Sequence, residues 1–363
     1  AAGDTLRQPE LARTLERIAA DGPAAFYTGE TAGLLVAEME AHGGLVTRAD
    51  LAAYRAVRRA PVRGSYRGCE VIGMPPPSSG GVTLIQALNI LEGYDLAASG
   101  FGAARTVHLM VEAMRLAFAD RAALLGDPEA NPDQPLERLL GRAYADSQRA
   151  TIDTARAAVS RAGPVPPPQS PETTHISVVD AQGNAVALTT TLEYGYGSGI
   201  VVPGAGFLLN NEMGDFNAGP GLTDRDGLIG TPPNLARPGR RMLSSMAPTV
   251  VTRDGRLVMV AGAMGGRTII TTVLQIIVNV LDHGMNAQEA VDAGRVHHQW
   301  LPDRILAEPF ALSPDARALL EALGHRVQET PNRYSAQVVV VEPDGTLAAG
   351  ADRRDAGSTA AAP

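Results

Sequence analysis

The spacing of apolar residues predicts helices in the first half of the chain. Between residues 103 and 125 they recur every three or four positions, as on the buried face of a long helix. The residues of this face are Val107, Met110, Val111, Met114 and Phe118. A second helix is expected over 82–91, after the run MPPPSSGG, and an earlier one is expected to end at Gly22.

From Thr173 onwards apolar and polar residues alternate, which predicts strands. The segments HISVVD and NAVALTTTL are joined by AQGN and are expected to form a β-hairpin. A strand is expected over 257–261, followed by a glycine turn and a helix, and a second hairpin is expected around 343–345. The proline-rich stretch GPVPPPQSPE at 163–172 is expected to be an extended, exposed linker. These elements together predict one compact unit of helices and strands.

Composition narrows the classes of protein to which the chain can belong. It has 363 residues, of which 45% are apolar, enough for a large core. A net charge of −8 and scattered basic residues argue against a nucleic-acid-binding surface. The single cysteine, Cys69, excludes an internal disulfide framework and a cysteine-based metal cluster. No apolar run has the length of a membrane span. The opening AAGDTLRQPE is no signal peptide, and this observation leaves the compartment of the protein undecided.

Thr173 stands between the proline-rich stretch and the first predicted strand. A threonine hydroxyl is a weak nucleophile until a base takes its proton. Cleavage between Glu172 and Thr173 would create an α-amine on the same residue, and its reference pKa of about 7.7–8.0 makes it a base near neutral pH. The position therefore suits an N-terminal nucleophile; the alternative is an ordinary turn that leads into a hairpin.

Three further groups have the chemistry of a substrate site. The backbone N–H groups of Gly265 and Gly266, between a strand and a helix, suit a developing oxyanion, or form only a tight turn. The adjacent hydroxyls of Ser244 and Ser245 suit a carboxylate, or serve only to cap and pack. Three carboxylates suit a cation such as an α-ammonium group, with metal or glycoside chemistry or solvated surface acids as alternatives. These carboxylates belong to Glu193, Glu212 and Asp215.

The same motifs occur together in the γ-glutamyltranspeptidase family, which the chain resembles over nearly its whole length. The matching segments, in the order of the family, are DLAAYRAVRRAPVRGSYRG, MPPPSSGG, LGDP, TTHISVVDAQGNAVALTTTL, LLNNEMGDF, RRMLSSMAPT, GAMGGRTIITTVLQIIVNVLDHGMNAQEAV and HHQWLPD. The resemblance implies an α+β fold, the four-layer αββα sandwich of N-terminal-nucleophile hydrolases. It also implies a precursor that cleaves itself between Glu172 and Thr173. Residues 1–172 would be the mostly helical C-terminal portion of a large subunit and residues 173–363 the small subunit, together one compact unit.

The resemblance also implies a role for each candidate residue. Thr173 would be the nucleophile, and Thr191 would hydrogen-bond to it and help to orient it. The oxyanion hole would be formed by the backbone of Gly265 and Gly266. The α-amino group of the donor would be held by Glu193, Glu212 and Asp215. The α-carboxylate of the donor would be contacted by Ser244 and Ser245.

The implied reaction is γ-glutamyl transfer or hydrolysis. Thr173 would attack the γ-carbonyl of glutathione or a related γ-glutamyl compound, and the acyl group would pass to water, an amino acid or a dipeptide. No metal and no organic cofactor is implied. The expected partners are these small molecules and the chain's own two fragments, which would form a heterodimer. Many bacterial relatives are periplasmic or secreted, which favours such a location without deciding it.

Three departures from the family pattern bear on these expectations. The large subunit of the family begins upstream of residue 1, and its upstream segment carries strands of the sandwich and an arginine that pairs with the donor's α-carboxylate. The chain is therefore expected to be a fragment or a divergent member. Glu193 stands where many members carry Asn and some bacterial members carry Glu. Asp226, in a segment (219–234) with the length of the family's lid loop, stands where a tyrosine is often found, and this predicts a more open site that favours hydrolysis and bulkier acyl groups.

Two other functions stay open. An acylase of the same family would act on a dicarboxylic side chain such as that of glutaryl-cephalosporin, which lacks the ammonium group that the acids should bind. A homologue that is never cleaved would serve as a scaffold or partner, although the presence of Thr173, Thr191 and the Gly265-Gly266 pair argues against this. The sequence decides neither the physiological donor and acceptor nor the ratio of hydrolysis to transfer.

Overall fold

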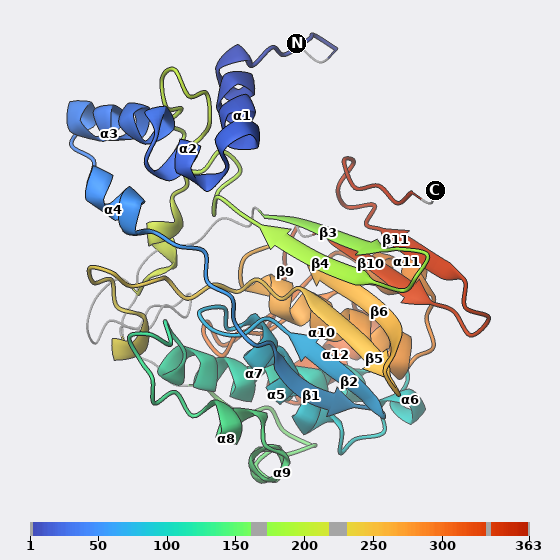
Figure 1. Cartoon of the computed structure of the whole chain (residues 1–363). Helices are drawn as coiled ribbons and strands as arrows, with labels where there is room; N and C mark the ends of the chain where they lie inside the picture. The colour runs from blue at the N-terminus through green and yellow to red at the C-terminus, as the bar shows by residue number, and fades with distance from the viewer. Residues whose placement is uncertain (1–2, 161–172, 218–230, 332–334, 362–363) are drawn as a thin grey trace. The chain divides into compact units, whose positions relative to one another are not determined.

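The computed structural model describes residues 3–160, 173–217, 231–331 and 335–361 (Figure 1). The expected linker at 163–172, with Glu172, lies outside the described residues, and so does Asp226. The chain divides into two compact units, one of Ala1–Arg59 with Tyr194–Asn211 and one of Ala60–Glu193 with Glu212–Pro363. Each unit contains residues from both sides of Thr173. The division is one of folding and does not test the expected subunit boundary, which is a covalent one.

The smaller unit is helical. Its first helix, α1 (Pro9–Asp21), ends at Gly22 as predicted, and the Gly22 N–H donates to the Ile18 carbonyl oxygen at 2.8 Å. The other helices are α2 (Pro23–Tyr27), α3 (Glu30–His42) and α4 (Arg48–Ala53). Its buried core is formed by Ala32, Leu35, Leu51, Val202 and Ala205. None of the candidate site residues belongs to this unit.

The larger unit is built on a six-stranded sheet in which each neighbouring pair is antiparallel. In order across the sheet the strands are β1 (Val62–Tyr66), β2 (Cys69–Gly73), β5 (Thr249–Arg253), β6 (Arg256–Ala263), β10 (Ala336–Val341) and β11 (Leu347–Ala351). The pairing of β2 with β5 joins strands from the two sides of Thr173, in the register Glu70↔Thr252 to Gly73↔Thr249. A bond cut before Thr173 would therefore leave the sheet continuous across both fragments.

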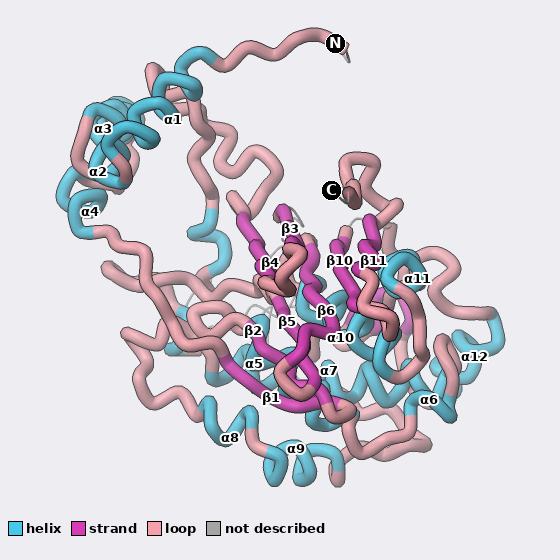
Figure 2. The backbone as a smooth tube through the Cα atoms, turned by 45° about the vertical axis from the view of Figure 1, so that its right-hand side comes forward, coloured by secondary structure: helices cyan, strands magenta, loops and turns pink. Residues whose placement is uncertain are grey.

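Helices cover one face of this sheet (Figures 1 and 2). α5 (Gly80–Leu91) packs on β1 and β2, α10 (Thr268–Leu281) packs on β6, and α11 (Ala287–Asp292) packs on β10 and β11. The predicted long helix is α7 (Ala104–Leu124), which packs on α5 and buries all five predicted apolar residues. All twelve residues of α5 are buried, because it is enclosed by the sheet, α7 and α10.

The predicted hairpin, β3 (Thr174–Val179) and β4 (Ala185–Thr190), forms a separate two-stranded layer that packs on β5, β6 and β10. Side chains alternate between the two faces of a strand, so one face of β6 packs against the helices and the other against the hairpin. Met259, Ala261 and Ala263 join the core shared with the helices, whereas Gly262 faces the ring of His175 in β3. The structure thus shows an α–β–β arrangement. The outer face of the hairpin is about half exposed at Ile176, Val178, Val186 and Leu188.

Shorter elements complete the larger unit. The helices are α6 (Leu96–Ser99), α8 (Leu136–Leu140), α9 (Arg142–Arg149) and α12 (Pro314–Ala322), with 3₁₀ turns at Glu212–Asp215 and Pro232–Asn234. A small three-stranded sheet contains β7 (Val296–His297), β8 (Ile305–Ala307) and β9 (Val327–Glu329). Among the described residues, no helix is both long enough and apolar enough to cross a membrane.

Gly80 offers a test of the packing that holds the start of α5. A Cβ added at this residue would lie 2.2 Å from the carbonyl oxygen of Met246 and 2.9 Å from the Cα of Ala247, so backbone would have to move. We expect Gly80→Ala to lower the free energy of unfolding by about 1–3 kcal/mol, the usual cost of overpacking. Urea denaturation measures this change.

Gly33→Ala in α3 is the matched control, because its added Cβ meets only the flexible end of the Arg48 side chain, at 3.2 Å. In a helix this change favours folding by up to about 1 kcal/mol. Equal unfolding midpoints for Gly80→Ala and the parent chain would contradict the close contact.

Candidate active site

Thr173 directly precedes β3 and Thr191 directly follows β4, at the open end of the hairpin. The strands pair antiparallel with Thr174 opposite Thr190. Extending this register by one residue places Thr173 opposite Thr191. Thr173 is 8% exposed, so its side chain is held within the fold. The juxtaposition that the resemblance requires thus follows from the strand register, while the hydrogen bond between the two residues stays a prediction.

The packing of β3 on β6 leads Thr173 towards the glycine turn. Ser177 Oγ lies 3.4 Å from the Val260 carbonyl oxygen, and the ring of His175 lies against Gly262. Continuing this pattern, two residues before His175 in the chain and two residues after Gly262, the next two residues are Thr173 and Met264. Both of them line a cavity of about 450 Å³. Because Gly265 follows Met264 directly, the nucleophile candidate and the turn lie at the same end of β6.

The Gly265-Gly266 turn has the backbone expected of an anion site. Both residues have positive φ, 127° and 57°, which a side chain would disfavour. Their carbonyl oxygens point into the start of α10, where they accept the N–H groups of Thr268 (3.1 Å) and Ile269 (3.2 Å). Within the described ranges, neither glycine N–H has a hydrogen-bond acceptor. These two donors at a helix N-terminus suit an oxyanion.

The three candidate acids form one cluster. Glu193 follows β4, while Glu212 and Asp215 lie on one 3₁₀ turn. Thr191 Oγ1 accepts the Glu193 N–H at 2.8 Å, and Glu193 adopts a left-handed backbone with φ of 71°, unusual for a residue with a side chain. Gly214 makes room for it, because a Cβ there would lie 2.5 Å from the Glu193 carboxylate.

Burial and mutual repulsion make these acids easier to protonate. Burial, then the charges of Asp215 and Glu212, raise the pKa of Glu193 to about 7. Burial and Asp215 also raise the pKa of Glu212 to about 7, although hydrogen bonds with the Glu193 backbone and the Thr191 side chain oppose this rise. Burial raises the pKa of Asp215, which Arg121 and Arg267 partly offset. A bound cation would favour the charged forms of all three.

Ser244 and Ser245 are held against the loop that precedes α5. Ser244 donates its N–H to the Pro77 carbonyl oxygen at 3.0 Å, and its own carbonyl oxygen accepts the Ser79 N–H at 2.8 Å. The Ser245 hydroxyl accepts from Arg121 Nη2 at 2.8 Å. Both serines are 8% exposed, so the predicted pair is buried, and its contact with a donor carboxylate stays a prediction.

Arg121, which donates to the candidate residue Ser245, was not among the candidates from the sequence. It is 7% exposed and comes from α7, three residues beyond Phe118 on the buried face of that helix. Burial, then the charge of Arg267, lower its pKa to about 9, so the guanidinium is charged at neutral pH, and the nearby Asp215 opposes this lowering. The spacing held a signal, because an arginine that continues an apolar helical stripe must find a polar partner in the core.

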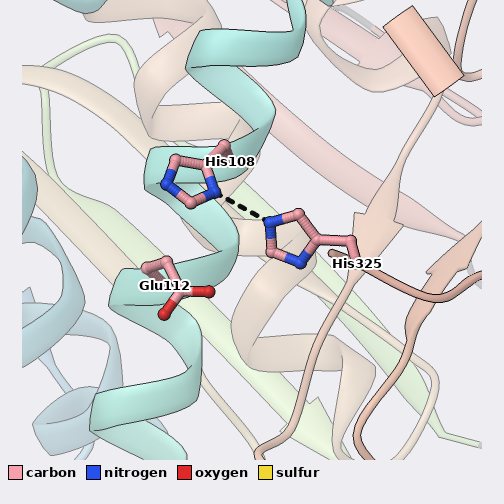
Figure 3. Close-up of side chains that lie close together, drawn as sticks. All are labelled: His108, Glu112 and His325. Atoms are coloured by element: carbon pink, nitrogen blue, oxygen red, sulfur yellow. Dashed lines mark hydrogen bonds between the residues drawn. The ribbon is translucent and has the colours of Figure 1, made fainter. Parts of the chain in front are cut away.

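A second buried polar cluster was also missed, and it contains His108, Glu112 and His325 (Figure 3). Their possible ligand atoms lie within 4.8 Å of one another. His108 Nδ1 lies 2.8 Å from His325 Nε2, and its Nε2 lies 2.9 Å from the Asp153 carbonyl oxygen. The Glu112 carboxylate forms a buried ion pair with Arg115 at 3.2 Å. Because the histidines bond each other and the carboxylate holds a cation, we interpret the cluster as core packing and not as a metal site.

Comparison with known sequences identifies the family to which this chain belongs. The sequence profile described as gamma-glutamyltranspeptidase matches residues 1–362. The chain is 48% identical over 355 residues to the glutathione hydrolase proenzyme of Escherichia coli K12, covering 97% of this chain and 61% of that protein. It is 42% identical over 360 residues to the acylase ACY 1 proenzyme of Pseudomonas sp. SE83, covering 99% of this chain and 62% of that protein.

Solved structures agree with this grouping. The cephalosporin acylase from Bacillus halodurans superposes with a TM-score of 0.84 at 29% identity, covering 98% of this chain and 62% of that one. This likeness and the antiparallel sheet with segregated helices confirm the expected α+β class of the N-terminal-nucleophile hydrolases. The chain spans about 60% of the length of the curated relatives that it matches. With the profile matched along residues 1–362, the chain belongs to the γ-glutamyltranspeptidase family.

Proposed function

We propose that this chain carries the nucleophile and the donor site of an enzyme that hydrolyses or transfers γ-glutamyl groups, after cleaving itself between Glu172 and Thr173. The observation that carries the proposal is the strand register. Extended by one residue beyond the Thr174↔Thr190 pair, this register supports a position of Thr173 opposite Thr191, at the end of β6 that runs into the Gly265-Gly266 turn. A nucleophile, a hydroxyl partner and two oxyanion donors thus belong to one corner of the fold. The names of relatives such as the Escherichia coli glutathione hydrolase proenzyme support the same reaction.

The reaction would begin at Thr173. Its freed α-amine takes the hydroxyl proton, directly or through a water, and Oγ attacks the γ-carbonyl carbon of the donor. The backbone N–H groups of Gly265 and Gly266 stabilise the oxyanion of the tetrahedral intermediate. One such donor typically lowers the activation free energy by about 2.7–4 kcal/mol. The intermediate collapses, the leaving amine takes the proton, and a γ-glutamyl ester remains on Thr173.

The second half of the reaction would release the acyl group. Water, an amino acid or a dipeptide gives a proton to the α-amine and attacks the ester carbonyl, and the same two N–H groups stabilise the second oxyanion. Breakdown returns the proton to Thr173 Oγ and releases glutamate or a new γ-glutamyl compound. Glutathione is the donor that the names of the relatives suggest. Every step uses groups of this chain and its substrates.

The two ends of the donor's amino acid group would occupy two wall regions of opposite charge. Its α-ammonium would lie by the acids Glu193, Glu212 and Asp215, and its α-carboxylate by Ser244 and Ser245. Hydrogen bonds and charge link these regions, since Ser245 accepts from Arg121, whose charge acts on Asp215. A site with both regions selects a zwitterionic donor over a simple acyl group.

A heterodimer of residues 1–172 and 173–363 would follow from the cleavage. The β2–β5 pairing crosses between these two fragments, and so does the bridge between Ser78 and Ser244. The core shared by α5, α7, α10 and the sheet also draws residues from both. These contacts would hold the fragments together without a peptide bond.

An acylase is the second candidate function. The acylase ACY 1 proenzyme and the cephalosporin acylase from Bacillus halodurans support it as relatives. A glutaryl group has no ammonium to offset the charge of the three clustered carboxylates. The acid cluster therefore favours the γ-glutamyl donor.

The cleavage is tested by intact mass and N-terminal sequencing of the purified chain after incubation at neutral pH, beside Thr173→Ala. We expect two fragments from the parent chain, one of which begins Thr-Thr-His-Ile-Ser, and a single uncut chain from the variant, because only the parent has the attacking hydroxyl. An uncut parent chain would refute self-cleavage of residues 1–363. The unprocessed homologue would then be the better description.

The donor class is tested with γ-glutamyl p-nitroanilide and glutaryl p-nitroanilide, which differ only in the α-ammonium group. We expect kcat/KM to be at least about tenfold higher for the γ-glutamyl compound, because one charge-assisted contact contributes about 1.5–3 kcal/mol. Release of p-nitroaniline measures both rates. A preference for the glutaryl compound would support the acylase instead.

The raised pKa values of the acids predict how donor binding depends on pH. Below pH 7 Glu193 and Glu212 gain protons and lose the charge that attracts an ammonium group. A single group with a pKa of about 7 is roughly tenfold less ionised at pH 6 than at pH 8. We therefore expect KM for the γ-glutamyl anilide to rise about tenfold between pH 8 and pH 6.

Glu212→Gln is the informative variant for this pH dependence. It removes a charge that raises the pKa of Glu193, so the rise in KM should begin at lower pH, while KM at pH 8 increases. The glutaryl anilide, which has no ammonium group, should show no such acid-side rise in KM. Identical pH profiles of KM for the two donors would refute the role of the acids.

A further inference from the structure

One guanidinium connects both serines at the carboxylate end of the site. Arg121 Nη2 donates to Ser245 Oγ at 2.8 Å. Its Nε donates to Ser79 Oγ at 2.8 Å, and the Ser79 hydroxyl donates to the Ser244 carbonyl oxygen at 2.7 Å. Arg121 therefore fixes the Ser245 side chain directly and the Ser244 backbone through Ser79.

These bonds determine where the serine protons can go. A hydroxyl has one proton to donate and two lone pairs that accept. Ser245 Oγ accepts from Arg121, and Ser244 Oγ accepts the Met246 N–H at 3.1 Å. No acceptor for either hydroxyl proton is present in the portions of the chain that the structure describes. Both O–H groups can therefore donate to a bound carboxylate.

The charge of Arg121 is also unusual among the buried arginines. Arg115 and Arg295 each form a direct ion pair with a carboxylate. Across the described segments, Arg121 has no carboxylate oxygen within the 4.0 Å of an ion pair, and its side-chain donors go to hydroxyl groups. A buried cation without a contacting anion costs free energy, which an anionic ligand nearby would offset.

We propose that Arg121 is a positioning and specificity-determining residue, which aims the Ser244 and Ser245 hydroxyls at the donor's α-carboxylate and so selects donors that carry one. The inference rests on the proposed function and deepens it. Arg121 does not touch the donor. It acts through the two serines and through its charge, which a donor carboxylate beside Ser245 would complement.

The test compares two donors that differ only at the α-carboxylate. γ-Glutamyl p-nitroanilide has it, whereas 4-aminobutyryl p-nitroanilide keeps the ammonium group and lacks the carboxylate. For Arg121→Gln we expect KM for the first donor to rise about 10- to 100-fold, the range for losing hydrogen bonds to a charged group. KM for the second donor should change less than threefold, and kcat should fall less than KM rises. Arg121→Lys keeps the charge but not both hydrogen bonds, so it should lie between the parent and the glutamine variant.

Ser79→Ala provides a milder variant in case Arg121→Gln fails to fold. It removes only the relay from Arg121 Nε to the Ser244 carbonyl oxygen. We expect a rise in KM of several fold for the γ-glutamyl donor alone, with thermal unfolding measured in parallel. Arg67→Gln is the matched control, because Arg67 donates to Asp282 and to the carbonyl oxygens of Glu92 and Tyr94 at a distant part of the same unit. It should alter stability and leave the ratio of the two donors unchanged.

The outcomes separate this inference from the proposed function. Equal losses on both donors in the Arg121 variants, or no donor-selective change in Ser79→Ala, would overturn the role of Arg121 while an active parent enzyme upholds the proposed function. A parent chain that turns over no γ-glutamyl donor would overturn both. A loss confined to the donor with a carboxylate would support the assignment.

Discussion

The packing of β3 on β6 is the contact on which the rest of the site depends. It requires a glycine at residue 262, because a Cβ there would lie within 2.4 Å of three atoms of the His175 ring. The ring itself is fixed, with Nδ1 2.8 Å from Thr189 Oγ1 and Nε2 3.0 Å from Ser177 Oγ. Burial lowers the pKa of His175 to about 4, so the ring is neutral at neutral pH and suits this enclosed position. Thr173, two residues before this anchor, is thereby held at the end of β6.

A balance of buried charges shapes the wall beside that corner. Repulsion and burial raise the pKa values of Glu193 and Glu212, while Arg121 and Arg267 partly offset the same effect at Asp215. Neither sign is neutralised by an ion pair between Arg121 and a carboxylate among the described residues. The charge of Arg121 is therefore balanced by hydroxyl groups and by the more distant charge of Asp215, and not by a contacting carboxylate.

The strand pairing gives the proposed cleavage a structural context. β2 and β5 lie next to each other in the six-stranded sheet, and the apolar core beneath them is shared by helices from both sides of Thr173. Residues on both sides of Thr173 thus contribute to one apolar core, which neither fragment would bury alone. That packing draws on residues from both sides of Thr173, so a cut before Thr173 would free the α-amine and leave these contacts in place.

The sequence by itself determined the elements and the chemistry that lie close together along the chain. Periodicity predicted α7 and the β3–β4 hairpin, and the position of Thr173 before that hairpin suggested an N-terminal nucleophile, which stays a prediction. The resemblance then supplied roles for residues spread over the whole chain. Only the tertiary structure decided which groups Arg121 bonds, since its partners Ser79 and Ser245 lie 42 and 124 residues away. The physical reason is that local periodicity reports which face of an element is buried, whereas a buried polar side chain is satisfied by whichever distant group the packing brings to it.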